Sequence, residues 1–136
     1  MDKLVTITVE LNTTIDKAWD FWTNPEHIVH WNFASEDWHC PSAVNDTKEE
    51  GKFSWRMEAK DGSFGFDFMG VYTKVVPQKL LQYDLGDGRP VSVQFEQIDD
   101  KIIVSETFQG EDINTLERQR EGWQCILNNY KSYVEK

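Results

Sequence analysis

The residues best suited to chemistry crowd into one segment, Phe21–Pro41, with the sequence FWTNPEHIVHWNFASEDWHCP. It holds all three histidines of the chain, three of its six tryptophans and one of its two cysteines. Histidine and cysteine are common zinc ligands, whereas tryptophan fills apolar cores and lines the pockets of small molecules. The segment therefore suggests three interpretations: a metal site, an aromatic core or the wall of a ligand pocket.

The metal interpretation starts from His27 and His30, which are three residues apart and would share one face of a helix. His39 and Cys40 follow in a stretch without a regular pattern. A zinc site would need its remaining ligands from that stretch, where no second Cys-x-x-Cys or His-x-x-x-His motif fixes the geometry. We therefore expect no metal and no other cofactor, and we interpret the histidines as surface or loop-anchoring groups.

Two carboxylates interrupt apolar stretches elsewhere in the chain. Glu106 stands in IIVSETF, in register with Ile102, Val104 and Phe108, and Asp67 interrupts FGFDFMG. An unpaired carboxylate that faced inward would be costly to bury, and it could orient a ligand or act as a general acid or base. The alternative is an ordinary surface carboxylate on a two-faced strand. Glu106 and Asp67 are the candidate catalytic residues, and no nucleophile motif accompanies them.

Hydrophobic periodicity predicts the elements that must position these groups. Residues Leu4–Leu11 alternate between apolar and polar and predict a half-buried strand. A helix from Ile15 follows, and then a short helix over Glu26–Trp31 that starts at an Asn-Pro pair. Residues Asn32–Glu50 show no period and predict a long loop, which we expect to act as a lid.

Alternating residues between Gly51 and Phe108 predict about five antiparallel strands, joined by turns such as Asp61-Gly62. From Asn114, which can cap a helix, an apolar stripe with helical spacing continues to the C-terminus. The sheet and this helix each have one apolar face to bury. We therefore predict an α+β fold in which a curved antiparallel sheet wraps around a long C-terminal helix, with two short helices after the first strand.

The length of 136 residues fits a single domain over residues 1–136. A net charge of −10 disfavours nucleic acid and anionic membrane surfaces as partners. No stretch reaches the roughly 20 apolar residues of a membrane span, and the N-terminus has no signal-peptide pattern. We therefore expect a cytoplasmic protein without membrane insertion, whose two cysteines are reduced thiols.

Five stretches resemble the SRPBCC (START-like, Bet v 1-like, helix-grip) superfamily, and more closely its branch named after the activator of Hsp90 ATPase (AHSA1-like). They are IDKAWDFWTNPEHIVHW (15–31), EEGKFSWRMEAKDG (49–62), GVYTKVVPQKLLQY (70–83), VSVQFE (91–96) and EGWQCILNNYKSYVEK (121–136). Together they are spread along the chain from residue 15 to residue 136, in the order of the fold. The resemblance implies a cavity between the concave face of the sheet and the long helix.

In stand-alone relatives such a cavity is thought to take small apolar or aromatic molecules, so the resemblance implies a small-molecule-binding protein. We expect its wall to contain ten residues: Trp31, Phe33, Trp38, Trp55, Met57, Phe66, Phe68, Tyr83, Glu106 and Trp123. Two alternatives stay open, because the superfamily hosts several functions. One is a cavity enzyme of cyclase or hydrolase type that uses a buried carboxylate. The other is an interaction module of Hsp90 co-chaperone type, and a homodimer is also compatible with the sequence.

Overall fold

The alternation near the N-terminus forms a strand, as predicted. The computed structural model describes residues 3–136, and in it strand β1 (Leu4–Leu11) buries every second residue from Val5 to Leu11. Helix α1 (Ile15–Thr23) begins where the Thr14 side chain accepts a hydrogen bond from the Lys17 N–H at 3.3 Å. Helix α2 (Pro25–Ile28) is capped by Asn24 and is shorter than the predicted helix, because residues 29–31 continue as turns.

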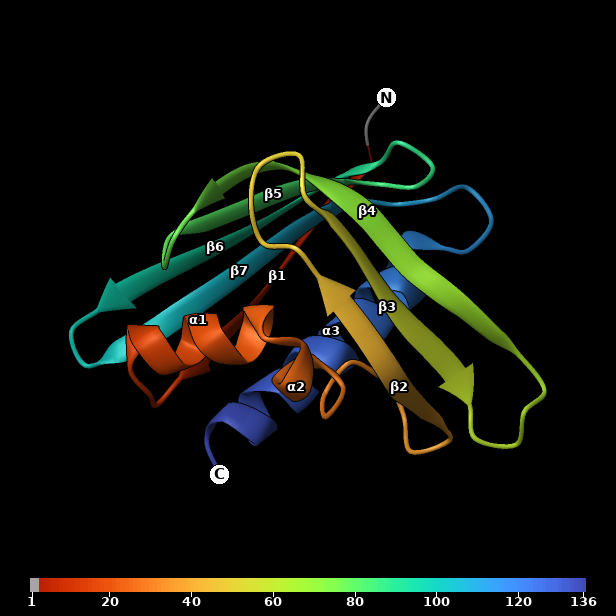
Figure 1. Ribbon diagram of the computed structural model, residues 1–136, viewed down its shortest axis with the longest axis horizontal. Helices are drawn as coiled ribbons and strands as arrows, with labels where there is room; N and C mark the ends of the chain where they lie inside the picture. Colours follow the sequence, from red (N-terminus) through yellow and green to blue (C-terminus); the bar gives the residue numbers. More distant parts are fainter. Residues whose placement is uncertain (1–2) are drawn as a thin grey trace.

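Six further strands and one long helix complete the chain: β2 (Trp38–Asn45), β3 (Lys52–Ala59), β4 (Gly65–Val76), β5 (Leu80–Leu85), β6 (Pro90–Ile98), β7 (Lys101–Gln109) and α3 (Leu116–Val134). The strands form one antiparallel sheet in the order β1-β7-β6-β5-β4-β3-β2. This curled sheet, the two short helices after β1 and the long C-terminal helix confirm the predicted helix-grip fold (Figure 1).

Strand β2 corrects the prediction of a loop over Asn32–Glu50. It pairs antiparallel with β3, and its register shifts between His39 and Ser42. The strand was hard to recognise because Pro41 lies inside it and its residues do not alternate cleanly. An edge strand tolerates proline, since one side of it has no partner to receive a hydrogen bond. The proposed lid is therefore in large part an edge of the sheet.

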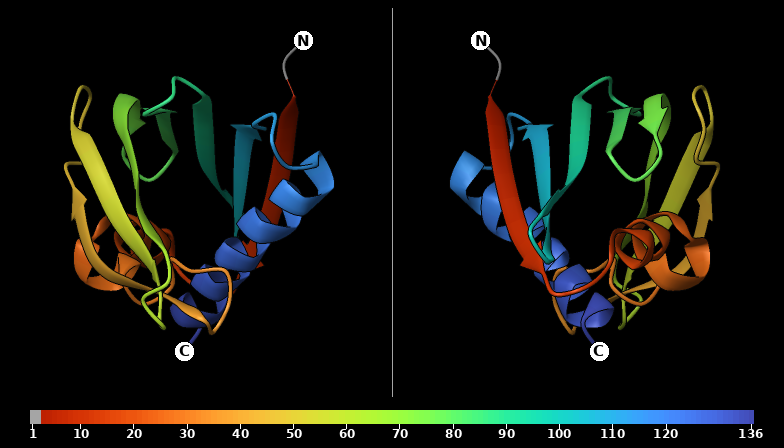
Figure 2. Two further views of the ribbon diagram at one scale, coloured as in Figure 1. Left: turned by 90° about the vertical axis from the view of Figure 1, so that its right-hand side faces the viewer. Right: turned by 90° about the vertical axis from the view of Figure 1, so that its left-hand side faces the viewer.

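The sheet curls into two arms, and α3 lies with one of them. In Figure 2 the N-terminal half of α3 runs beside β1 and β7, while β2 and β3 form the opposite arm. Two hydrogen bonds fasten the helix to β1: Lys131 Nζ donates to the Glu10 carbonyl at 2.5 Å, and Arg120 donates to the Thr6 carbonyl at 3.0 Å. Side chains, rather than the helix itself, therefore cover the middle of the concave face.

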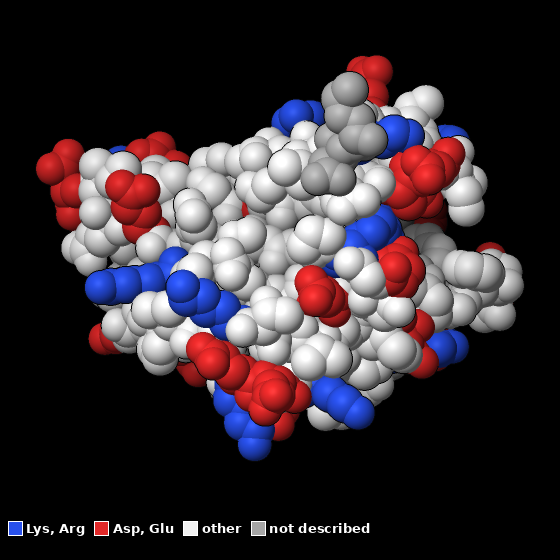
Figure 3. Space-filling model, turned by 90° about the horizontal axis from the view of Figure 1, so that it is seen from above, with Lys and Arg blue, Asp and Glu red and all other residues white. Residues whose placement is uncertain are grey.

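The surface carries both signs of charge. On the face that looks upward in Figure 1, acidic groups occur in several separate places with Lys and Arg between them, and a largely uncharged area lies at the centre (Figure 3). Among the described residues this face shows no continuous basic area. None of the helices in the described part of the chain has the length and apolar character needed to span a membrane.

At Gly70 in β4, the neighbouring strand and the core leave no room for a side chain. A Cβ at this position would collide with the Asp84 carbonyl and lie 2.9 Å from the ring of Phe53. We expect Gly70→Ala to lower the free energy of unfolding by about 1–3 kcal/mol, because backbone and a buried ring cannot move aside cheaply. Chemical denaturation measures this loss.

Gly122 in α3 supplies the matched control. A Cβ there would meet no atom within 4 Å, and the residue lies inside a helix. Gly122→Ala should therefore raise the free energy of unfolding by about 0.5–1 kcal/mol through helix propensity. Equal effects of the two substitutions would contradict the close packing at Gly70.

Candidate functional site

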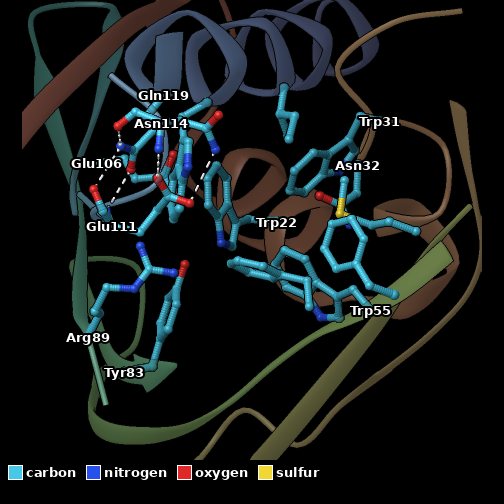
Figure 4. Close-up of a pocket in the computed structure, with 15 residues that line it drawn as sticks. Trp22, Trp31, Asn32, Trp55, Tyr83, Arg89, Glu106, Glu111, Asn114 and Gln119 are labelled. Atoms are coloured by element: carbon cyan, nitrogen blue, oxygen red, sulfur yellow. Dashed lines mark hydrogen bonds between the residues drawn. The ribbon is translucent and has the colours of Figure 1, made fainter. Parts of the chain in front are cut away.

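A cavity of about 290 Å³ lies between the concave face of the sheet and α3. Its wall combines aromatic and polar side chains from six elements and three connecting segments: Trp22, Trp31, Asn32, Trp55, Met57, Phe66, Phe68, Tyr83, Arg89, Glu106, Glu111, Asn114, Gln119, Trp123 and Ile126. In Figure 4 most of the labelled polar groups gather at one end, and the labelled tryptophans lie at the other end together with Asn32. The cavity is therefore amphipathic along its length.

The aromatic end is built by rings that pack edge to face or tilted. The ring centroids of Trp22 and Trp31 are 5.0 Å apart, and those of Trp31 and Trp55 are 5.9 Å apart. Trp31 also donates its indole N–H to the Phe21 carbonyl at 2.9 Å, whereas the buried indole N–H groups of Trp22 and Trp55 have no partner among the described residues. Packing, rather than hydrogen bonding, therefore holds most of this wall.

Trp123 is one of three residues that α3 contributes to the wall, with Gln119 and Ile126. Its ring stacks on Phe108 of β7, with centroids 4.0 Å apart and an interplanar angle of 10°, and it meets the edge of Phe68 at 5.9 Å. Stacked and edge-to-face pairs add stability beyond the area they bury. One large ring thus bridges the helix to the β7 and β4 sides of the sheet and closes one side of the cavity.

Glu106 enters the polar end from β7. It stands opposite Val93 of β6 and Ile7 of β1, so its side chain lies on the apolar concave face. Only 6% of the residue is exposed, and its carboxyl group makes no hydrogen bond to any described residue. Removal from water disfavours the charged form and raises the pKa of Glu106 to about 8. The side chain is therefore mostly a neutral carboxylic acid at pH 7.

Tyr83 of β5 shares this end of the cavity. The residue is 2% exposed, and its hydroxyl also has no hydrogen-bond partner among the described residues. Burial raises the pKa of Tyr83 well above its usual value, and the charges of Glu106 and Tyr72 raise it further. Tyr83 is therefore a neutral hydroxyl that can donate one hydrogen bond into the cavity.

The polar residues on the other side of this end are already engaged with one another. Gln119 accepts from the Glu111 N–H at 2.8 Å and donates to the Asn114 carbonyl at 2.9 Å. The Glu111 carboxylate accepts from the Asn114 N–H at 2.6 Å. This network holds the segment between β7 and α3 in place. Thr115, rather than the predicted Asn114, caps the helix.

Arg89 is the cationic side chain of the wall. It donates to the Asp87 carboxylate at 2.7 Å and to the Gln109 carbonyl at 3.1 Å. It comes from the turn between β5 and β6, where the residues show no periodic pattern. Arg89, Gln119 and Glu111 were not predicted as wall residues from the sequence. They lie in a turn, in the first turn of a helix and in a connecting segment, where the periodicity of strands does not show which way a side chain points.

Eight of the ten residues expected in the wall surround the cavity: Trp31, Trp55, Met57, Phe66, Phe68, Tyr83, Glu106 and Trp123. Phe33 and Trp38 are not among the lining residues. Phe33 lies at the end of the turns after α2, where its carbonyl accepts from Asn129 at 2.5 Å. Trp38 packs at the sheet edge against Phe64 and Phe66, with centroids 6.0 and 6.1 Å away.

Of the two candidate catalytic carboxylates, only Glu106 reaches the cavity. Asp67 is exposed and lies 3.5 Å from Arg56, which also pairs with Glu58 at 2.8 Å. Asp67 alternates with Phe66 and Phe68 along β4, so it faces the opposite side of the sheet from these rings.

The histidines have local partners. His27 Nδ1 lies 2.7 Å from the Tyr133 hydroxyl, and His39 lies 3.8 Å from the Glu58 carboxylate. Burial raises the pKa of the Cys40 thiol, which does not favour metal binding. Within residues 3–136 no three His, Cys, Asp or Glu side chains gather as a metal site.

The fold and the cavity define a helix-grip protein with an amphipathic pocket. More particularly, the chain belongs to the family of activator of Hsp90 ATPase homolog 1-like proteins, whose model matches residues 12–135. This confirms the resemblance of the sequence to the AHSA1-like branch. No curated protein sequence matches the chain.

Solved structures agree with this assignment. The chain is 41% identical to an AHSA1-like protein from Aeromonas hydrophila, over 96% of this chain and 92% of that one, with a TM-score of 0.88. It is 45% identical to a protein from Cytophaga hutchinsonii, over 96% and 91% of the two chains, with a TM-score of 0.85. The Aha1 dimer from Colwellia psychrerythraea shares the fold at 13% identity and a TM-score of 0.75, over 97% and 96% of the chains.

The burial of Glu106 predicts a specific dependence of stability on pH. Below about pH 4.5 the carboxyl group is protonated in both the folded and the unfolded chain. Between about 4.5 and about 8 only the unfolded chain releases the proton, so the free energy of unfolding falls as pH rises, and above about 8 this contribution is constant. The loss between pH 6 and pH 9 should be about 2–3 kcal/mol.

Glu106→Gln should abolish this loss, because an amide of the same shape does not ionise. Urea denaturation of the two proteins at several pH values measures the effect. Glu96→Gln is the matched control, since Glu96 is an exposed carboxylate on the neighbouring strand β6. A wild-type slope that survives in Glu106→Gln would contradict the burial of an unpaired carboxyl group.

Proposed function

We propose that the protein binds a small apolar or aromatic molecule in the cavity between the sheet and α3. The observation that supports this most directly is the composition of the wall, which combines tryptophan and phenylalanine rings with a few polar groups gathered at one end. Small-molecule sites usually have this character. Membership in the family fits the proposal but does not name a ligand.

The size of the cavity limits the ligand. A volume of about 290 Å³ lies near the lower end of the range of ligand pockets, which begins at about 300 Å³. A molecule with one or two fused rings fits this space better than a long acyl chain. Its affinity would come from apolar burial, at about 25 cal/mol per Å² before the entropic losses of binding.

A second candidate function is acid–base catalysis, and Glu106 is the observation that favours it. A buried carboxyl group with a pKa of about 8 can both give and take a proton near neutral pH. Tyr83 would polarise the same substrate. Conversion of a bound molecule by the wild type but not by Glu106→Gln, with binding retained in both, would establish this function.

The relatives suggest two further proposals, a homodimer and a complex with a chaperone, and neither depends on the cavity. A homodimer is a proposal drawn from the Aha1 dimer of Colwellia psychrerythraea, and a chaperone partner is one drawn from the family description. Exposed apolar side chains such as Phe64 and Met69 would be available to either. Light scattering and a pull-down with an Hsp90-type chaperone separate these assemblies from small-molecule binding.

Filling the cavity tests the main proposal. A panel of one- and two-ring aromatic compounds should contain members that quench tryptophan fluorescence and raise the melting temperature of the wild type. Ile126→Trp places a large ring in the cavity wall and should lower the affinity for those members at least tenfold. The affinity falls because the added ring occupies the volume that the ligand needs.

Ile98→Trp is the matched control, since it makes the same substitution at an exposed site at the end of β6, outside the wall. This variant should bind as the wild type does. A panel without any binder, or equal binding by the two variants, would reject the cavity as the ligand site.

A further inference from the structure

We infer that the polar end of the cavity recognises an oxygen acceptor, such as a ketone, on an otherwise apolar ring system, through hydrogen bonds donated by Glu106 and Tyr83. This inference rests on the proposed function and deepens it by naming the chemical class of the ligand. An apolar hydrocarbon would fill the aromatic end but leave both donors unused. A cationic ligand would not accept the protons that both groups can donate.

The sheet register brings the two groups to the same part of the concave face. Glu106 lies in a cross-strand row with Val93 and Ile7, and Tyr83 lies in the adjacent row with Val91. Strand β6, which separates them, contributes only these two small valines to that part of the face. Both polar side chains can therefore extend over β6 into the same space, which is the polar end seen in Figure 4.

Neither group has a partner within the described part of the chain, although each is more than nine-tenths buried and lines the cavity. Buried polar side chains are almost always hydrogen-bonded, and leaving one unpaired is costly. The polar atoms of these two side chains, unlike the buried indole N–H groups of Trp22 and Trp55, are reached from the cavity, so a ligand there can contact them. A ligand oxygen would satisfy both at once.

The charged groups that line the same part of the cavity are already paired within the protein. The titratable or charged groups that line the same cavity are Tyr83 from β5, Arg89 from the turn before β6 and Glu111 from the segment before α3. Strands β1 and β6 present the uncharged Ile7 and Val93 to Glu106, and α3 presents Gln119 and Trp123.

The Glu111 carboxylate accepts two hydrogen bonds from Asn114, and Arg89 is paired with the Asp87 carboxylate, so both charges are engaged within the protein. At neutral pH, Glu106 as a carboxylic acid and Tyr83 as a phenol both have a proton to donate. Each of these two groups can therefore donate one hydrogen bond to a ligand oxygen.

Three compounds with one skeleton test the inference: tetralin, 1-tetralone and 1-aminotetralin. Near pH 6 the wild type should bind 1-tetralone about tenfold or more tighter than tetralin, the difference expected for one or two buried hydrogen bonds. 1-Aminotetralin, which is a cation at this pH, should bind more weakly than 1-tetralone. Titrations followed by NMR or calorimetry give the three affinities.

The pH profile and two variants show which groups are responsible. The preference for 1-tetralone over tetralin should shrink several-fold near pH 9, because ionised Glu106 cannot donate, and it should persist there in Glu106→Gln, whose amide still donates. Tyr83→Phe should lower the affinity for 1-tetralone alone. Tyr72→Phe is its control, because the Tyr72 hydroxyl donates to Asn45 at 2.6 Å and lies outside the wall.

The outcomes separate this inference from the proposed function. Equal affinity for tetralin and 1-tetralone would overturn the inference and leave the cavity as an apolar binding site. Tighter binding of 1-aminotetralin would overturn it in favour of a cation site. If none of the three binds while other aromatic compounds bind in an Ile126-dependent way, only the inference fails. If nothing binds at all, both fail.

Discussion

The stack of Trp123 on Phe108 sets the spacing on which the rest of the structure depends. The two rings lie nearly parallel with centroids 4.0 Å apart, so the Trp123 side chain packs between α3 and strand β7 at this point. Hydrogen bonds from Lys131 and Arg120 fix the same helix along β1. The helix therefore lies along one arm of the curled sheet, and the cavity lies between the helix and the concave face.

That spacing explains why Glu106 stays unpaired. It lies two residues before Phe108 on the same face of β7, beneath the helix but beyond reach of a hydrogen-bonding partner among the described residues. Gln119, a long polar side chain that α3 contributes to the wall, is fully used by the segment from Glu111 to Thr115. Natural proteins break the rule of satisfied buried polar groups mainly at functional sites. The same carboxyl group thus weakens the fold at neutral pH and gives the cavity its polar end.

Much of the fold could be predicted because each long element has a clean period. The alternation in β1 and β7 determines which residues face inward, including Glu106, and the same parity along β4 turns Asp67 outward between two inward phenylalanines. Strand β2 escaped prediction because Pro41 and a register shift break its pattern.

Only some of the wall residues could be predicted from the sequence, for a related reason. The periodicity of strands and helices identifies wall residues such as Trp55 and Trp123. It gives no information on side chains that reach the cavity from turns, such as Arg89. The aromatic residues Phe33 and Trp38 were expected in the wall from their type and proximity in the chain. Their positions depend on how the segment after α2 joins the sheet edge, which no local pattern encodes.

The most direct test of this account is the titration of the Glu106 side-chain carboxyl carbon, followed by ¹³C NMR in the ligand-free protein. A carboxyl group buried at the polar end of the cavity, with no hydrogen-bonding partner among residues 3–136, should titrate with a midpoint near 8. A midpoint near the ordinary value of 4.5 would mean that water or a counter-charge reaches the group, and the polar end of the cavity would not have the buried, unpaired carboxyl group described here.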